Sequence, residues 1–127
     1  MKTGYVVAFA MLAGIGMGAA GVHSLQAQTK PPVYMVGVVD VSDADGYAKE
    51  YLPAAQASIK AHGGVYVAAG PGTVIEGSLP GTRFVILRWD SLEQLKDWYA
   101  SPEYTAAHQA GSKYAKYNVI AVNGTPQ

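Results

Sequence analysis

The segment "PPVYMVGVVDV", Pro31 to Val41, decides how this chain folds. Behind its two prolines it is almost continuously apolar and β-branched, which predicts a strand, because proline can precede but not occupy a central strand. Alternate residues of a strand face opposite sides of its sheet. Both alternating sets are apolar or small: Val33, Met35, Gly37, Val39 and Val41 on one side, and Tyr34, Val36 and Val38 on the other. The strand therefore requires cover on both faces.

The next segment, "SDADGYAKEYLPAAQASIKAHGG", has the pattern of an amphipathic helix. Ser42 is the expected N-cap, and the glycine pair at 63–64 ends the helix because glycine adopts the left-handed C-terminal conformation readily. Pro53 removes a backbone donor inside this segment, so we expect a kink or a restarted helix there. Strand-like runs follow at residues 65–69, 73–77 and 82–90, with a bulge or bend at "GPG", 70–72.

Two helices are predicted between the third strand-like run and the C-terminus. The first begins with a capping box, Ser91 with Gln94 three residues on. The second begins in "SPEY", where Ser101 can cap and Pro102 suits the first helical position, and it continues to about Lys116. The run "YNVIAVNG", 117–124, predicts a closing strand.

The order of these elements predicts an α+β fold. A ferredoxin-like sandwich, with a four-stranded antiparallel sheet and helices on one face, is the economical packing of strand, helix, paired strands, helix pair and strand. The domain spans 33–124, between a linker at 28–32 and a tail at 125–127. Because the first strand needs cover on its other face as well, we expect a second copy of the chain there, forming a homodimer.

The first 27 residues have the pattern of a signal peptide. Met1 and Lys2 give a positive start, the run from Gly4 to Val22 is uncharged, and a cleavage point follows Ala27. We therefore expect an exported protein, periplasmic or secreted. The alternative is an uncleaved N-terminal membrane anchor, because the apolar run, at roughly 1.5 Å per helical residue, spans most of a bilayer core of about 30 Å.

The composition argues against several classes of function. Nine basic and nine acidic residues balance, and the basic ones are scattered, which argues against a nucleic-acid partner. No cysteine is present, so disulfides, thiolate catalysis and cysteine-ligated metals are excluded. Beyond the signal segment only His62 and His108 remain among the histidines, without metal-ligand spacing. We predict no metal site and no built-in cofactor.

Several blocks in the same order resemble a known family. These are "YMVGVVDVSDADGYAKEYLPAA", the "AHGG" after the first helix, "VIEG", and "WYASPEYTAA". Together they are similar to the family called domain of unknown function 1330, in the dimeric α/β-barrel superfamily, over about 33–124. The resemblance implies a ferredoxin-like protomer that pairs sheet to sheet as a dimeric α/β barrel, with a cleft between helices and barrel. The family implies no general activity.

Three residues are candidates for a site. His62 ends the first helix and is a possible general acid or base, or else a C-terminal cap that contacts free carbonyls. Arg88 shares one side of its strand with Phe84 and Ile86, and it would clamp a ligand anion or pair with a carboxylate such as Glu76.

Tyr104 is the third candidate, with a hydroxyl positioned to reach the cleft, and His108 lies one turn beyond it. The other aromatics of the domain are expected mainly in the core. We expect a homodimer whose cleft binds or transforms a small apolar or aromatic carbonyl compound, with His62, Arg88 and Tyr104 as proton-transfer group, anion clamp and positioning hydroxyl. The alternatives are a non-catalytic ligand-binding or envelope-stress module and a purely structural dimer.

Overall fold

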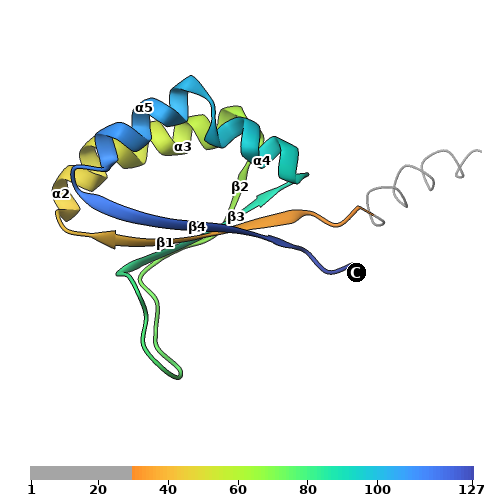
Figure 1. Cartoon of the computed structure of the whole chain (residues 1–127), viewed down its shortest axis with the longest axis horizontal. Coiled ribbons are helices and arrows are strands. Elements are labelled where there is room, and N and C mark those ends of the chain that lie inside the picture. Colours follow the sequence, from red (N-terminus) through yellow and green to blue (C-terminus); the bar gives the residue numbers. More distant parts are fainter. Residues whose placement is uncertain (1–29) are drawn as a thin grey trace, which may run out of the picture. The chain divides into compact units, whose positions relative to one another are not determined.

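The computed structural model describes residues 30–127, of which Pro32–Gly124 form one compact unit. A sheet lies beneath a layer of helices (Figure 1). The elements are β1 (Val33–Val41), α2 (Ala44–Gly46), η1 (Tyr47–Tyr51), α3 (Leu52–Ala61), β2 (Val65–Gly70), β3 (Arg83–Trp89), α4 (Leu92–Tyr99), α5 (Pro102–Gly111) and β4 (Ala115–Asn123). The predicted signal segment, 1–27, lies outside the described residues. Within 30–127 no helix has the length and apolar character needed to cross a bilayer.

The four strands form an antiparallel sheet in the order β2-β3-β1-β4. At the centre of β1, Gly37 lies opposite Val85 of β3 and Val119 of β4. With the helices on one face, this topology is the ferredoxin-like α+β fold, and the predicted fold class is confirmed.

The two faces of β1 differ in cover, not in chemistry. Its first set of side chains is buried under the helices, including Met35 and Val39, both 4% exposed. The other set, Tyr34, Val36 and Val38, is only partly shielded and lies on the face away from the helices. Phe84, Ile86, Ile120 and Val122 share that face with them. Residues 30–127 thus present a partly exposed apolar surface on the side away from the helices, which we call the outer sheet face.

The helix boundaries follow local chemistry. Asp43, not the expected Ser42, caps the first helix by accepting a hydrogen bond from Gly46 N, while the Ser42 hydroxyl donates to Tyr114 O. Ser91 and Ser101 cap α4 and α5 as predicted. The irregularity expected at Pro53 takes the form of η1, a π-helical turn immediately before α3. Because α3 begins at Leu52, Pro53 falls in its first turn, where the N–H group that proline lacks is not needed.

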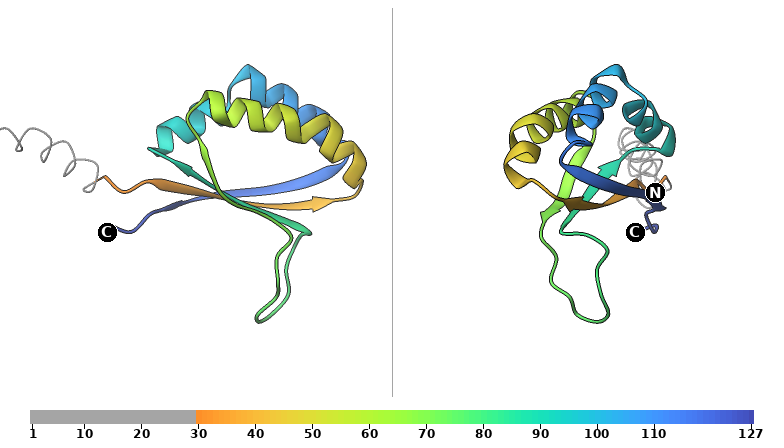
Figure 2. Two further views of the ribbon diagram at one scale, coloured as in Figure 1. Left: turned by 180° about the vertical axis from the view of Figure 1, so that it is seen from behind. Right: turned by 60° about the vertical axis from the view of Figure 1, so that its left-hand side comes forward.

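Two sequence-based boundaries were wrong. No strand forms at 73–77; instead residues 71–82 make a long loop between β2 and β3 that projects from the sheet on the side opposite the helices (Figure 2). We call this loop the arm. The last helix ends at Gly111 instead of near Lys116, and β4 begins at Ala115, so Lys116 belongs to the closing strand.

Candidate functional site

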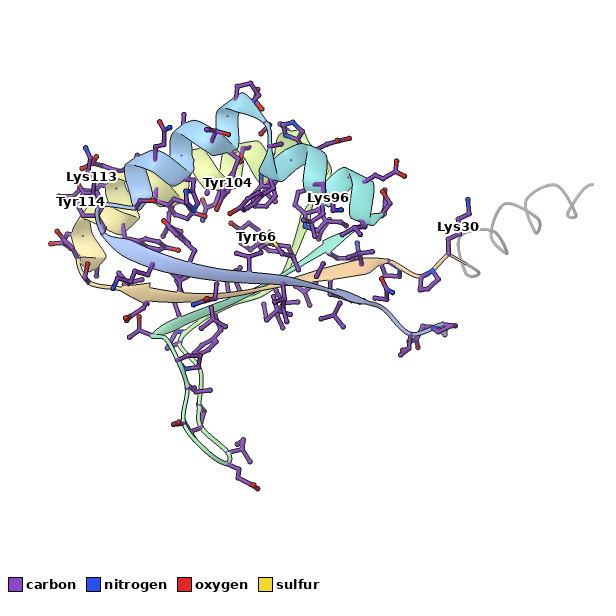
Figure 3. All side chains as sticks on the ribbon, in the orientation of Figure 1. Lys30, Tyr66, Lys96, Tyr104, Lys113 and Tyr114 are labelled. Carbon is purple, nitrogen blue, oxygen red and sulfur yellow. The ribbon has the colours of Figure 1, made fainter. Side chains whose placement is uncertain are left out.

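An aromatic cavity lies between the sheet and the helices. Five tyrosines line it, from four different elements: Tyr47, Tyr51, Tyr66, Tyr104 and Tyr117. Figure 3 shows Tyr104 in the helix layer and Tyr66 on the sheet, on opposite sides of this space. Gly37 and Val85 form part of its floor. We call the five residues the tyrosine cluster.

The π-helical turn η1 places two members of the cluster. Tyr47 and Tyr51, at its two ends, are both buried, and their rings stack with centroids 4.9 Å apart and planes 23° apart. A π turn has more residues per turn than an α-helix, so side chains four positions apart come closer to alignment. The local irregularity before Pro53 therefore directs both rings into the cavity.

A hydroxyl pair closes the helix side of the cavity. Tyr51 Oη and Tyr104 Oη are 2.7 Å apart and buried. Trp98 packs on Tyr104 with ring centroids 4.1 Å apart, and its Nε1 donates to Ser58 Oγ at 3.0 Å. Ser101 accepts from Tyr104 N and donates to Trp98 O at 2.7 Å. Tyr104 is thus held by η1, α4 and the cap of α5 at once.

Burial makes the phenols of the cluster harder to ionise than ordinary tyrosines, because it raises their pKa values. Burial raises the pKa of Tyr104 to about 12, although its hydrogen bond with Tyr51 works in the opposite direction. Burial, reinforced by Tyr104, raises the pKa of Tyr51 further. The pKa values of Tyr117 and Tyr66 are also raised by burial. These phenols are therefore neutral hydrogen-bond donors, not bases.

The Tyr117 hydroxyl is buried and has no hydrogen-bond partner within the described part of the chain. Its ring lies 5.2 Å from Tyr51 and 4.8 Å from His108, centroid to centroid. A buried hydroxyl without a partner is uncommon. The oxygen lies against Gly111 of α5, where an added Cβ would clash with it, so it is enclosed by protein although the ring lines the cavity.

Arg83 is the only charged residue among those that line the cavity within 30–127. It begins β3 with its side chain on the inner face, and its guanidinium carbon is 5.9 Å from the Tyr47 ring centroid. Arg83 also lines two open grooves, one between α3 and β2 and one beside α2 at the base of the arm. The cation therefore lies where the cavity meets the surface.

The cavity leaves about 30 Å³ for the centres of water molecules. One water needs about 10–15 Å³ on this measure, so the cavity as described has room for about two. A larger ligand requires the side chains at its mouth to move. Tyr66 and Arg83 are the ones that also line the α3–β2 groove.

A family model for a domain of unknown function (DUF1330) matches residues 32–125. The chain belongs to the DUF1330 family. No curated protein is significantly similar to this DUF1330 chain in sequence.

Solved structures of distant sequence share the fold. The RPA0582 protein of unknown function from Rhodopseudomonas palustris has a TM-score of 0.62 at 17% identity, over 80% of this chain and 90% of that one. SnoaB, a cofactor-independent oxygenase from Streptomyces nogalater, has a TM-score of 0.58 at 12% identity, over 76% and 96%. A dimeric protein of unknown function and ferredoxin-like fold from Bacteroides fragilis has a TM-score of 0.53 at 13% identity, over 73% and 96%.

The three residues predicted as a site lie apart in this DUF1330 domain. Tyr104 is 2% exposed and lines the cavity. Arg88 is exposed on the outer sheet face, opposite Tyr34, so the sheet separates it from Tyr104. Glu76, its suggested partner, lies in the arm.

His62 lies at the C-terminus of α3, as the capping alternative describes. Its Nδ1 is 2.9 Å from Ser58 O and its Nε2 is 3.5 Å from Glu103 Oε2. It does not line the cavity. Within 30–127 no three histidine and carboxylate side chains gather as metal ligands would.

Arg83, Tyr66 and Tyr117 are the site residues that sequence reasoning missed. The sequence does place Arg83 on the same side of β3 as the apolar residues Val85 and Leu87, because alternate residues of a strand share a side. Each side of β3 has apolar residues and one arginine, so the alternation alone does not predict which side faces the helices.

Proposed function

We propose that this DUF1330 protein is an exported homodimer that binds a small, flat, largely apolar compound through an anionic or carbonyl oxygen. The binding site is the tyrosine-lined cavity, with Arg83 as the anion clamp and Tyr104 as a positioning hydroxyl. The observation that carries the proposal is Arg83, a partly buried cation at the mouth of an aromatic cavity with no acidic residue in its lining.

The surroundings of Arg83 leave its charge uncompensated. Within residues 30–127 no carboxylate lies within ion-pair distance of it. A cation withdrawn from water without a counter-charge lowers stability, and the Tyr47 ring offsets only about 0.5–2 kcal/mol of that cost. A ligand carboxylate or enolate would supply the missing charge, and a planar guanidinium binds such groups through two parallel hydrogen bonds.

Once the side chains at its mouth move, the lining of the cavity suits the apolar body of such a ligand chemically. Flat aromatic walls favour a planar compound, and a few polar groups fix its orientation.

Binding accounts for the site better than acid–base catalysis does. The described lining contains tyrosine, tryptophan, arginine and aliphatic residues, but no carboxylate or imidazole to accept a proton. The tyrosines do not fill that role, because their pKa values are raised. This favours the ligand-binding alternative over the proton-transfer role expected for His62.

Oxygenation without a cofactor is a second candidate function. The neutral hydroxyl pair of Tyr51 and Tyr104 could stabilise an enolate, and SnoaB, described as a cofactor-independent oxygenase, shares the fold. Without a base in the cavity, such a substrate would have to bind already ionised. Dioxygen consumption with an acidic phenol would distinguish this candidate from simple binding.

The homodimer is supported by the outer sheet face. No helix or strand among residues 30–127 packs over its apolar side chains, and the Bacteroides fragilis neighbour is described as dimeric. The signal-like segment 1–27 supports export to the periplasm or medium.

Ligand titration followed by tryptophan fluorescence tests the proposal, because Trp98 lines the cavity. Benzoate and salicylate are expected to quench or shift the emission, and benzamide, which lacks the charge, to bind more weakly. Arg83→Gln should weaken benzoate binding about tenfold or more, since a hydrogen bond to a charged group contributes about 1.5–3 kcal/mol.

Lys49→Gln is the control, because it removes one positive charge from an exposed position of η1 that lines neither the cavity nor the outer sheet face. Equal benzoate affinity in the Arg83→Gln variant and the unmodified protein would refute the anion clamp. Absence of binding for all three compounds would refute the ligand class.

A further inference from the structure

The α3–β2 groove adjoins the aromatic cavity and is open to the surface. Tyr66 and Arg83 line both spaces. The groove leaves about 560 Å³ for the centres of water molecules, whereas the cavity leaves about 30 Å³. A ligand that is too large for the cavity therefore has adjoining space for the part that stays outside.

The chain directions of α3 and β2 place the two ends of this groove. At one end, Leu52 at the start of α3 and Pro71 after β2 line a neighbouring groove together with Arg83. At the other end only three residues join α3 to β2, so Lys60, in the last turn of α3, lies close to Val65. The helix and the strand run in opposite directions, and Arg83 and Lys60 lie at opposite ends of the groove.

The wall between these two ends is apolar. The groove follows the edge strand β2 from Val65 to Ala69, a length of about 13 Å at about 3.3 Å per residue. Val65 and Tyr66 are both exposed, and Ile59 lines the groove from α3. An extended apolar chain lying along β2 would shield these side chains from water, which is favourable.

The charged residues of the groove are both basic. Among the lining residues within 30–127 these are Lys60 and Arg83, and no carboxylate is present. In that part of the chain neither cation lies within ion-pair distance of a carboxylate. Gln56, one helical turn before Lys60, adds a side-chain amide on the same face of α3. The groove therefore presents a cation at each end and no counter-charge.

The two other grooves beside the cavity lack this combination. One lies between α4 and the edge strand β4 and shares Tyr117 and Val119 with the cavity; we call it the α4–β4 groove. Its charged residue in the described chain is Lys96, and Arg83 does not line it. In the groove beside α2, the charged lining residue among 30–127 is Arg83 itself. A ligand held by Arg83 therefore meets a second cation in the α3–β2 groove.

We infer that the α3–β2 groove binds a tail of the ligand and that this tail ends in an acidic group paired with Lys60. The inference rests on the proposed function, because the aromatic part of the ligand is taken to lie in the cavity with its first acidic group on Arg83. The ligand class is then an aromatic acid with an apolar chain, up to about 13 Å long, that carries a second acid at its end.

Two ligands that differ in one group test this inference. The first, 2-(5-carboxypentyloxy)benzoate, has an acidic tail, and the second, 2-(5-carbamoylpentyloxy)benzoate, has an uncharged amide in the same place. Each is titrated at low salt into protein produced from the full-length sequence, with tryptophan fluorescence as the readout. The acid should bind about two- to fivefold more tightly than the amide, as expected for one exposed ion pair. The short-tailed 2-(carboxymethoxy)benzoate should show no such gain over its own amide.

Lysine variants locate the end of the tail. Lys60→Gln should abolish the preference for the acidic tail and leave the affinity for the amide unchanged. Lys49→Gln, at an exposed position of η1 outside the groove, and Lys96→Gln, in the α4–β4 groove, should both retain the preference. A preference that survives Lys60→Gln, or that is lost in Lys96→Gln instead, would overturn the inference.

Benzoate separates this inference from the function on which it rests. If benzoate binds but the acidic tail gives no gain, the tail site is refuted and the proposed function stands. If benzoate and the tailed ligands all fail to bind, both are refuted.

Tethering gives a second measurement that does not depend on charge. The chain has no cysteine, so Lys60→Cys introduces a single thiol. A 2-alkoxybenzoate whose chain ends in a methanethiosulfonate should label Lys60→Cys faster than Lys49→Cys, after each rate is divided by that for methyl methanethiosulfonate. Excess benzoate should slow the labelling of Lys60→Cys. Equal normalised rates, or labelling that benzoate does not slow, would contradict a tail in the α3–β2 groove.

Discussion

At the scale of single residues, the hydroxyl groups of Tyr51 and Tyr104 depend on each other. They are buried, 2.7 Å apart, and each is the other's partner. Tyr104→Phe leaves the Tyr51 hydroxyl buried without its partner, so we expect the free energy of unfolding to fall by about 1–3 kcal/mol. Urea denaturation measures the loss, with exposed Tyr99→Phe as the control.

The double variant Tyr51→Phe with Tyr104→Phe should lose less stability than the sum of the two single variants, because it removes both polar groups together. Additive losses would mean that the two hydroxyls do not interact in solution.

The raised pKa values of the tyrosine cluster predict alkaline instability. In the unfolded chain a tyrosine ionises near pH 10, about the ordinary value. In the folded chain the pKa of Tyr104 is about 12. As the pH rises between these values the unfolded chain has released its proton and the folded chain has not, so the free energy of unfolding falls with pH.

Below about pH 10 the Tyr104 hydroxyl keeps its proton in both the folded and the unfolded chain. Its ionisation therefore should not change the free energy of unfolding near neutral pH. Tyrosinate absorbance during a pH titration measures the effect, and the buried phenols should ionise together with unfolding. Ionisation of every tyrosine near the ordinary pKa, without unfolding, would disprove the burial of Tyr51 and Tyr104.

At the scale of elements, the cap of α5 joins two helices. Ser101 is buried, accepts from Tyr104 N and donates to Trp98 O at 2.7 Å. Ser101→Ala removes an N-cap and leaves a buried donor unpaired, so it should cost about 1–3 kcal/mol of unfolding free energy. Ser91→Ala removes an exposed cap of α4 and should cost about 0.5–1 kcal/mol. Equal losses in thermal or urea unfolding would contradict the connecting role of Ser101.

The elements predicted correctly from sequence are those with local signals. Ser91 and Ser101 begin helices because a short hydroxyl satisfies free N–H groups, and β1 follows Pro32 because proline is excluded from a central strand. The arm was mistaken in part for a strand because Val74 and Ile75 are β-branched. Strand formation requires a pairing partner, and that information is not local.

The site was harder to predict from sequence than the fold. Tyr104 lines the cavity, whereas the arginine that lines it is Arg83 and not Arg88, the arginine proposed from the sequence. Arg83 and Arg88 both lie beside apolar neighbours, and only the position of the helices distinguishes the inner face from the outer. The π-helical turn that aligns Tyr47 with Tyr51 has no sequence signature beyond Pro53.

At the scale of the whole molecule, the outer sheet face is expected to hold the dimer together. Val36 lies at its centre, opposite Ile86 and Ile120. Val36→Asp would bury an unpaired carboxylate in a sheet-to-sheet contact, so we expect a monomer in sedimentation velocity experiments. Ala57→Asp, on the exposed side of α3, is the control and should remain dimeric. A dimeric Val36→Asp protein would require a different contact surface.

The alternation of side chains along β1 has a consequence for how such proteins diversify. Odd-numbered positions from Val33 to Val41 face the helices, and even-numbered positions from Tyr34 to Val38 lie on the outer sheet face. In the proposed ligand-binding dimer, substitutions that change ligand choice and substitutions that change subunit association would therefore fall on alternating positions of β1. Evolution could then revise either property within one strand while preserving the other.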